Sequence, residues 1–176
     1  MSNNFGFIDI ILLGMIAGFI ILRLRNILGR RTGHEAKSPG VFDEKKEFLK
    51  GAEIAYENII TSFAKGEKEK LKALLTKEIY INFEQAIDHR NEENIKSELT
   101  FVGVKESSVD KYEKINNEFL ATVKIICEII SVKKDKNGTI IEGNPDKIKI
   151  VKDFWKFSKS VTSSNPNWFL AEIISK

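Results

Sequence analysis

A long apolar segment near the N-terminus constrains this chain more than any other feature. Residues 5–22 have the sequence FGFIDIILLGMIAGFIIL, in which Asp9 is the single charged residue. Extended to Leu24, the segment would form a helix about 30 Å long, which matches the hydrocarbon core of a bilayer. Asp9 lies near the interface, where a carboxylate costs less than the ~2.5–3.5 kcal/mol expected at mid-bilayer. We therefore predict a transmembrane helix within residues 1–24.

The residues that flank this segment predict its orientation. No Lys or Arg precedes it, whereas Arg23 and Arg25 follow it directly, which is the reverse of a cleaved signal peptide. Because positive residues stay on the cytoplasmic side, we expect a single-pass protein of the inner (cytoplasmic) membrane. Its N-terminus would lie outside and its C-terminal domain in the cytoplasm. The lone Cys127 is consistent with a reducing compartment.

The whole net charge of +3 comes from one short stretch. Residues 23–37 sum to +4, whereas residues 38–176 sum to zero. Four of the five arginines form what we call the basic collar: Arg23, Arg25, Arg30 and Arg31. The collar would set the topology and could bind anionic headgroups, because each cation near such a surface contributes about 1 kcal/mol. We interpret residues 25–42 as a juxtamembrane collar and linker.

Two glycines inside the predicted span have the spacing of a helix-packing motif. Gly14 and Gly18 form a Gly-x-x-x-Gly pair, which lets two helix backbones approach closely. Small residues are also common in membrane helices generally. Two interpretations therefore stay open, a homodimer through this helix and an ordinary span composition.

Residues 43–176 begin with a helical pattern. Asp43 can cap a helix that continues to about Lys65, since apolar residues recur there at three- and four-residue spacing, and Gly66 would end it. Two further helices are expected, one over residues 67–75 and one from a cap at Thr76 to about residue 90.

From residue 98 the pattern changes to short β-rich runs. Strands are expected over residues 99–104, 109–114, 119–132, 148–157 and 168–174, with hairpin turns at residues 116–117 and 135–138. Alternate residues of the long run, from Phe119 to Ile129, would share one face. Helices followed by an antiparallel meander predict an α+β domain in which helices cover one face of a curved sheet.

Residues with reactive chemistry are sparse. Cys127 alternates with large apolar residues, which favours a buried structural thiol over a nucleophile. His34 and His89 have no second ligand at metal-binding spacing, and no phosphate-binding loop occurs, so we expect no metal and no cofactor. The domain is neutral and interleaves Lys with Glu, so we expect no nucleic acid partner.

Several strings in a fixed order resemble one family. They are Leu22-Arg-Leu-Arg25, the LGRRTGHE of residues 28–35, the FAKG of 63–66, the LKALL of 71–75, the DFWKF of 153–157 and the NPNW of 165–168. Together they resemble the bacterial TimA group, which is similar to the C-terminal domain of subunit 44 of the mitochondrial inner-membrane translocase. The likeness covers nearly the whole chain.

This resemblance implies a nuclear transport factor 2-like fold and a non-enzymatic adaptor role at the inner membrane, in protein translocation. It implies binding to anionic lipid, through the helix Lys45–Lys65, and to a protein partner, which could be a translocase, a chaperone or a ribosome. The chaperone-recruiting region of the mitochondrial relative has no counterpart here, because a predicted transmembrane helix stands in its place.

Three alternatives concern the folded domain. Trp155, Phe157 and Trp168 could line a pocket for an acyl chain or an apolar peptide, or they could belong to the core. An isomerase-like enzyme would need an acid/base pair in the cavity, for which the candidates are Asp153, Glu128 and Tyr56. A ribosome-anchoring factor is a third class of function. The neutral charge of the domain counts against its direct contact with RNA.

Overall fold

The computed structural model describes residues 40–163 and 167–174. The chain divides into two compact units between Glu44 and Lys45, and the description below concerns the second. The predicted transmembrane helix within residues 1–24 and most of the linker lie outside the described residues. Within the described ranges, no helix is both long and apolar enough to cross a membrane.

The first described helix ends where the sequence indicates and begins earlier. Helix α2 (Gly40–Lys65) starts three residues before Asp43, the residue that was predicted to cap it. Gly66 has a φ of +74° and ends the helix as predicted. Its amide donates to the Phe63 carbonyl and the Glu67 amide to the Ser62 carbonyl, which together form a Schellman motif.

The other two helices follow at once. Helix α3 (Lys68–Lys72) is shorter than predicted, because Leu74 and Thr76 exchange backbone hydrogen bonds with Leu170 instead of continuing the helix. Helix α4 (Lys77–Glu92) follows Thr76, which occupies the N-cap position as expected.

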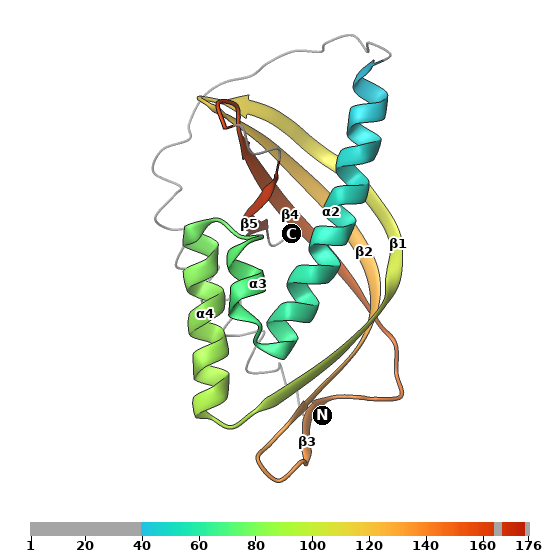
Figure 1. Cartoon of the computed structure of the whole chain (residues 1–176). Helices are drawn as coiled ribbons and strands as arrows, with labels where there is room; N and C mark the ends of the chain where they lie inside the picture. The colour runs from blue at the N-terminus through green and yellow to red at the C-terminus, as the bar shows by residue number, and fades with distance from the viewer. Residues whose placement is uncertain (1–39, 164–166, 175–176) are drawn as a thin grey trace. The chain divides into compact units, whose positions relative to one another are not determined.

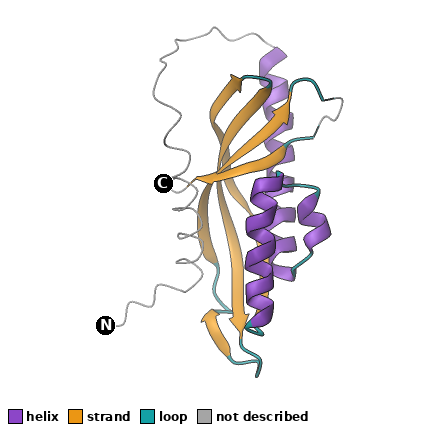
Figure 2. Ribbon diagram, turned by 90° about the vertical axis from the view of Figure 1, so that its left-hand side faces the viewer, coloured by secondary structure: helices purple, strands orange, loops and turns teal. Residues whose placement is uncertain are grey.

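Five antiparallel strands form the sheet, in the order β1-β2-β4-β5, with β3 also paired to β2. They are β1 (Lys96–Ile115), β2 (Glu118–Lys134), β3 (Ile140–Gly143), β4 (Lys149–Ser160) and β5 (Phe169–Ile174). Figures 1 and 2 show the three helices on one side of a strongly curved sheet. The α+β class with a curved antiparallel sheet is thus confirmed.

Two strand predictions were wrong in detail. The runs at residues 99–104 and 109–114 belong to one continuous strand, since β1 keeps its pairing with β2 through three register shifts, in which Val102, Lys105 and Asp110 are the extra residues of β1. Strand β3 was missed because it has only four residues. The hairpin turns at residues 116–117 and 135–138 are confirmed.

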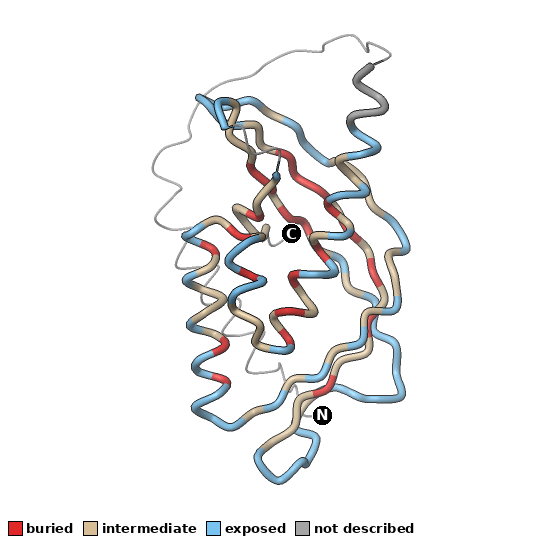
Figure 3. The backbone as a smooth tube through the Cα atoms, in the orientation of Figure 1, coloured by how far each residue is buried: buried red, intermediate tan, exposed pale blue. Residues whose placement is uncertain are grey.

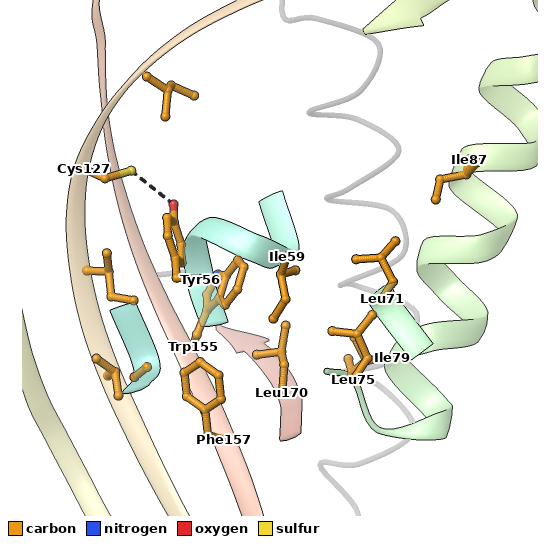
Figure 4. Close-up of a cluster of buried hydrophobic side chains, with 14 residues drawn as sticks. Tyr56, Ile59, Leu71, Leu75, Ile79, Ile87, Cys127, Trp155, Phe157 and Leu170 are labelled. Carbon is orange, nitrogen blue, oxygen red and sulfur yellow. Dashed lines mark hydrogen bonds between the residues drawn. The ribbon is translucent and has the colours of Figure 1, made fainter. Parts of the chain in front are cut away.

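The core lies between the helices and one face of β2 and β4. The predicted alternation is confirmed, since Ala121, Val123, Ile125 and Cys127 are all fully buried. Figure 3 shows this buried stripe along the middle of the sheet, and Figure 4 shows the helix side chains that meet it. Those side chains are Tyr56 and Ile59 of α2, Leu71 of α3, Leu75 after it, and Ile79 and Ile87 of α4.

Arg90 of α4 contacts the C-terminal end of α2 in two ways. Its Nη2 atom donates to the Phe63 carbonyl at 3.0 Å, and its guanidinium carbon lies 5.4 Å from the centre of the Phe63 ring. That carbonyl belongs to the last turn of α2, where the helix dipole favours a cation. A buried arginine is therefore stabilised by the last turn of α2 where α2 and α4 meet.

Two glycines of the β2–β3 hairpin provide a test of this backbone. Gly143 has a φ of +85°, and an added Cβ would lie 2.0 Å from the Ser131 carbonyl oxygen, whereas Gly138 has a φ of +82° with no atom within 4 Å. We expect Gly138→Ala to cost about 1–2 kcal/mol of left-handed strain. Gly143→Ala should cost more, because the backbone must also move.

The measurement is urea unfolding of the full-length protein, followed by circular dichroism, for both variants. Equal losses of unfolding free energy would show that the close contact at Gly143 relaxes freely, and would contradict the expectation.

Candidate functional site

Two of the three residues predicted as acid/base candidates meet inside the domain. The Tyr56 hydroxyl donates to the Asp153 Oδ2 atom at 2.6 Å, and the Cys127 Sγ atom lies 3.3 Å from the same hydroxyl oxygen. These residues come from α2, β4 and β2, far apart in the sequence. Figure 4 shows Tyr56 pointing from the helix toward Cys127 on the sheet. We call these three residues the buried polar cluster.

Local structure explains why they converge. Tyr56 lies on the face of α2 that packs on the sheet and is 1% exposed. Asp153 and Trp155 lie on the same face of β4, as alternate residues do, and the Tyr56 ring packs 4.4 Å from Trp155. An aspartate in a strand of core aromatics requires a donor from the covering helix, and Tyr56 provides it.

The cluster shifts the titration of all its members. Burial, and then the neighbouring Asp153 carboxylate, raise the pKa of Tyr56 far above its usual range, so the phenol keeps its proton. Burial raises the pKa of Asp153, while the hydrogen bond from Tyr56 acts in the opposite direction. Burial likewise raises the pKa of the Cys127 thiol, which makes it a poor nucleophile.

Glu128, the third candidate, lies elsewhere. It follows Cys127 in β2 and therefore lies on the opposite face of the sheet, where Lys105 donates to its Oε1 atom at 3.0 Å. The structure thus brings together Tyr56 and Asp153 and separates Glu128 from them. The Tyr56 hydroxyl already donates its proton to a hydrogen bond with Asp153, so this hydrogen bond occupies the polar groups of the pair within the core.

The three predicted aromatic residues fall into two environments. Trp155 and Phe157 are 3% and 1% exposed and belong to the core. Trp168 is half-buried, and its ring centre lies 4.7 Å from that of Phe48 and 6.3 Å from that of Tyr112.

Around Trp168, aromatic residues from α2, β1, β2 and the segment before β5 form a cluster that the sequence analysis missed. We call it the aromatic end, and its members are Phe48, Tyr112, Phe119 and Trp168. The Tyr112 and Phe119 rings stack with centres 6.1 Å apart. The sequence does place Phe48 on the inner face of its helix and Tyr112 in a β-rich run. No local pattern in the sequence joins the members, because they come from four separate segments of the chain.

The remaining predicted sites cannot be placed. The basic collar (Arg23, Arg25, Arg30 and Arg31) and the pair Gly14 and Gly18 lie outside the described residues. Among residues 40–163 and 167–174, no group of three or more His, Cys, Asp or Glu side chains could hold a metal ion.

The buried polar cluster predicts a pH dependence of stability. The folded-state pKa of Asp153 lies above the unfolded value of about 3.9, so protonation of Asp153 favours the folded state. This contribution is complete below the unfolded pKa and is lost as the pH rises through the folded pKa.

Tyr56→Phe should steepen that loss, because it removes the donor that lowers the Asp153 pKa and costs about 1–3 kcal/mol at neutral pH. Asp153→Asn should flatten it, because the amide keeps an oxygen acceptor and cannot ionise. The measurement is the unfolding free energy of both full-length variants from pH 4 to neutral pH. A slope identical to that of the wild type in both would contradict the assignment.

Comparisons with known proteins bear on the domain as a whole. Comparison with curated protein sequences gives no significant match. Among solved structures, the chain is similar to the intermembrane space region of the chloroplast protein ARC6, with 11% identity over 81% of this chain and 100% of that one and a TM-score of 0.45. A de novo β-sheet design protein shows 13% identity over 73% of this chain and 87% of that one, with a TM-score of 0.31. Both TM-scores are too low for either similarity to indicate a function of this chain.

The family comparison is of a different kind. A family model described as a Tim44-like domain matches residues 36–175. The match includes every helix and strand of the described unit, together with the buried polar cluster and the aromatic end. The chain belongs to the Tim44-like domain family.

Proposed function

We propose that this protein is a membrane-anchored, non-enzymatic adaptor of the TimA type at the inner membrane. The proposal rests on the order of three segments in the sequence. An apolar segment comes first, the basic collar follows it, and the Tim44-like domain at residues 36–175 comes last. An anchor, a positive collar and a neutral folded domain together suit a protein that holds a binding module against a bilayer.

The proposed orientation places the N-terminus outside and the Tim44-like domain in the cytoplasm. The collar would contact anionic headgroups, while the folded domain engages a protein partner such as a translocase, a chaperone or a ribosome. A pair of anchors packed through Gly14 and Gly18 would make the adaptor a dimer.

The contacts of the buried polar cluster support the non-enzymatic assignment. Tyr56 is 1% exposed, and its hydroxyl donates to Asp153 in the same core that fixes α2 on the sheet. An isomerase-like enzyme would have to present this pair to a substrate. That enzyme would therefore require α2 to move away from the sheet, which would break the hydrogen bond between Tyr56 and Asp153.

Membrane extraction tests the anchor. The full-length protein, expressed in a bacterial host, should resist extraction by high salt and dissolve in detergent, because burial of residues 5–24 and not charge would hold it. Protease added outside spheroplasts should leave the C-terminal domain intact. Release by salt alone, or digestion of the domain from outside, would overturn the proposal.

A charge-reversed collar provides the matched comparison. Replacing Arg23, Arg25, Arg30 and Arg31 by Glu should expose the domain to external protease or block insertion, because the positive charges set the orientation. The control reverses Lys136 and Lys147, two exposed lysines of the neutral domain, and should leave the orientation unchanged. Equal behaviour of the two variants would remove the role of the collar.

A further inference from the structure

Strand β4 has a neighbour on both sides along only part of its length. β2 pairs with β4 from Lys149 to Ser160, whereas β5 pairs with it only from Phe154 to Ser158. Figure 1 shows the short β5 beside the C-terminal part of β4. Within the described residues, the N-terminal part of β4 therefore has a strand neighbour on one side only. We call residues 147–152, which lead into this part and form it, the open edge.

The backbone of the open edge is regular. The pairing of β4 with β2 runs without a register shift, whereas that of β1, the other long edge strand, is interrupted three times. Alternate residues of a strand direct their backbone N–H and C=O groups toward opposite neighbours, so about half of these groups point away from β2. In the part of the chain that the structure describes, no backbone hydrogen bond occupies that side of residues 147–152. A further strand can therefore add there by backbone pairing.

Exposed isoleucines occur along this edge. Ile148 and Ile150 are 56% and 60% exposed, the two highest values among the large hydrophobic residues that the structure describes. Ile150 is opposite Glu128 of β2, so it lies on the sheet face turned away from the helices. Its diagonal neighbours on that face are Ile126 and Ile130. A strand added at the open edge would cover Ile150 and extend this apolar strip.

Lysines without an ion pair lie between and beside these isoleucines. Lys147, Lys149 and Lys152 are exposed, and none of them forms an ion pair with another described residue. Other lysines of the sheet, such as Lys105 and Lys134, are paired with glutamates. No acidic residue occurs between Lys147 and Lys152. The open edge is therefore locally positive, although the domain as a whole is neutral.

These lysines decide between two kinds of added strand. A second copy of the same edge would bring the lysines of both copies together, which destabilises a strand pair, and lysines on exposed edges commonly prevent such self-pairing. A strand of opposite charge would instead place carboxylates opposite the lysines. The residues opposite Lys149 and Lys152 would then be acidic, whereas those opposite Ile150 and Val151 would be apolar.

We propose that the open edge binds an extended, acidic segment of a partner protein as an added antiparallel strand. Opposite residues 152 to 147, that segment carries side chains in the order acidic, apolar, apolar, acidic, apolar, acidic. It pairs with the backbone of β4 on the same side as β5. This inference rests on the proposed adaptor function and adds the chemistry of the partner.

A synthetic peptide tests the proposal. The sequence Glu-Val-Val-Glu-Val-Glu follows the proposed order, and a fluorescent label at one end reports its binding to the full-length protein in detergent by anisotropy. We expect saturable binding that weakens as salt is added, because the ion pairs are exposed. The control peptide has Lys in place of each Glu and should not bind. No binding of the acidic peptide, or equal binding of both peptides, would overturn the proposal.

Backbone methylation separates strand addition from other kinds of binding. Two further peptides of the acidic sequence carry N-methyl groups on alternate residues, one on the odd-numbered and one on the even-numbered positions of the peptide. Because only alternate amides face β4, one of them should bind about tenfold more weakly or worse and the other should bind like the parent peptide. Equal affinities of the two methylated peptides would contradict backbone pairing.

Charge reversal locates the peptide on the protein. Lys149→Glu combined with Lys152→Glu should weaken binding about tenfold, because two attractions become repulsions. The matched control combines Lys72→Glu with Lys77→Glu, two exposed lysines of α3 and α4. It should bind the peptide like the wild type, and circular dichroism checks that both double variants are folded. Equal affinities of the two double variants would place the peptide elsewhere and overturn the proposal.

The proposed anchor fails or holds independently of these results. Extraction of the protein by salt alone would contradict the adaptor function, while peptide binding in detergent could still be measured. A protein that resists salt extraction but does not bind the acidic peptide would overturn the role of the open edge and leave the anchor standing.

Discussion

The packing of α2 on β2 and β4 is the interaction on which the rest of the domain depends. One face of this helix carries Tyr56 and Ile59, which close the core over Val123, Ile125 and Trp155. The same helix provides the donor for Asp153 and, through its last turn, the carbonyl that holds Arg90. Loss of this one contact would expose a carboxylate, an arginine and the apolar face of the sheet together, so the domain should unfold cooperatively.

Much of this architecture follows from local pattern in the sequence. Residues 119–132 alternate so regularly that burial of Cys127 could be predicted, and Gly66 ended its helix because only a residue tolerant of positive φ suits a Schellman motif. The predictions that failed concern features that depend on contacts between distant parts of the chain. The sequence between residues 104 and 109 resembles a break, yet pairing with β2 continues through bulges, and α3 stops early because Leu170 competes for its backbone. Such competition depends on a partner strand nearly a hundred residues away.

The residues of the candidate site could be predicted from the sequence, but the contact between them could not. Tyr56 and Asp153 could be named because they are ionisable residues within apolar patterns, but their contact depends on how α2 crosses the sheet, which no local signal specifies. Glu128 differs from them, since the alternation of the long strand already predicts that it lies on the opposite face from Cys127. The aromatic end escaped prediction because four separate segments contribute to it.

The bulges of β1 would have a consequence if the proposed anchor holds the protein on a membrane. Within the described sheet β1 is an outermost strand of twenty residues, long enough to template pairing with a neighbouring molecule. Tethering many copies to one membrane would raise their encounter rate and make such pairing a hazard. Three interruptions of register between Phe101 and Lys111 deny a second chain any long run of regular hydrogen bonds, so crowding on the proposed membrane surface need not lead to aggregation.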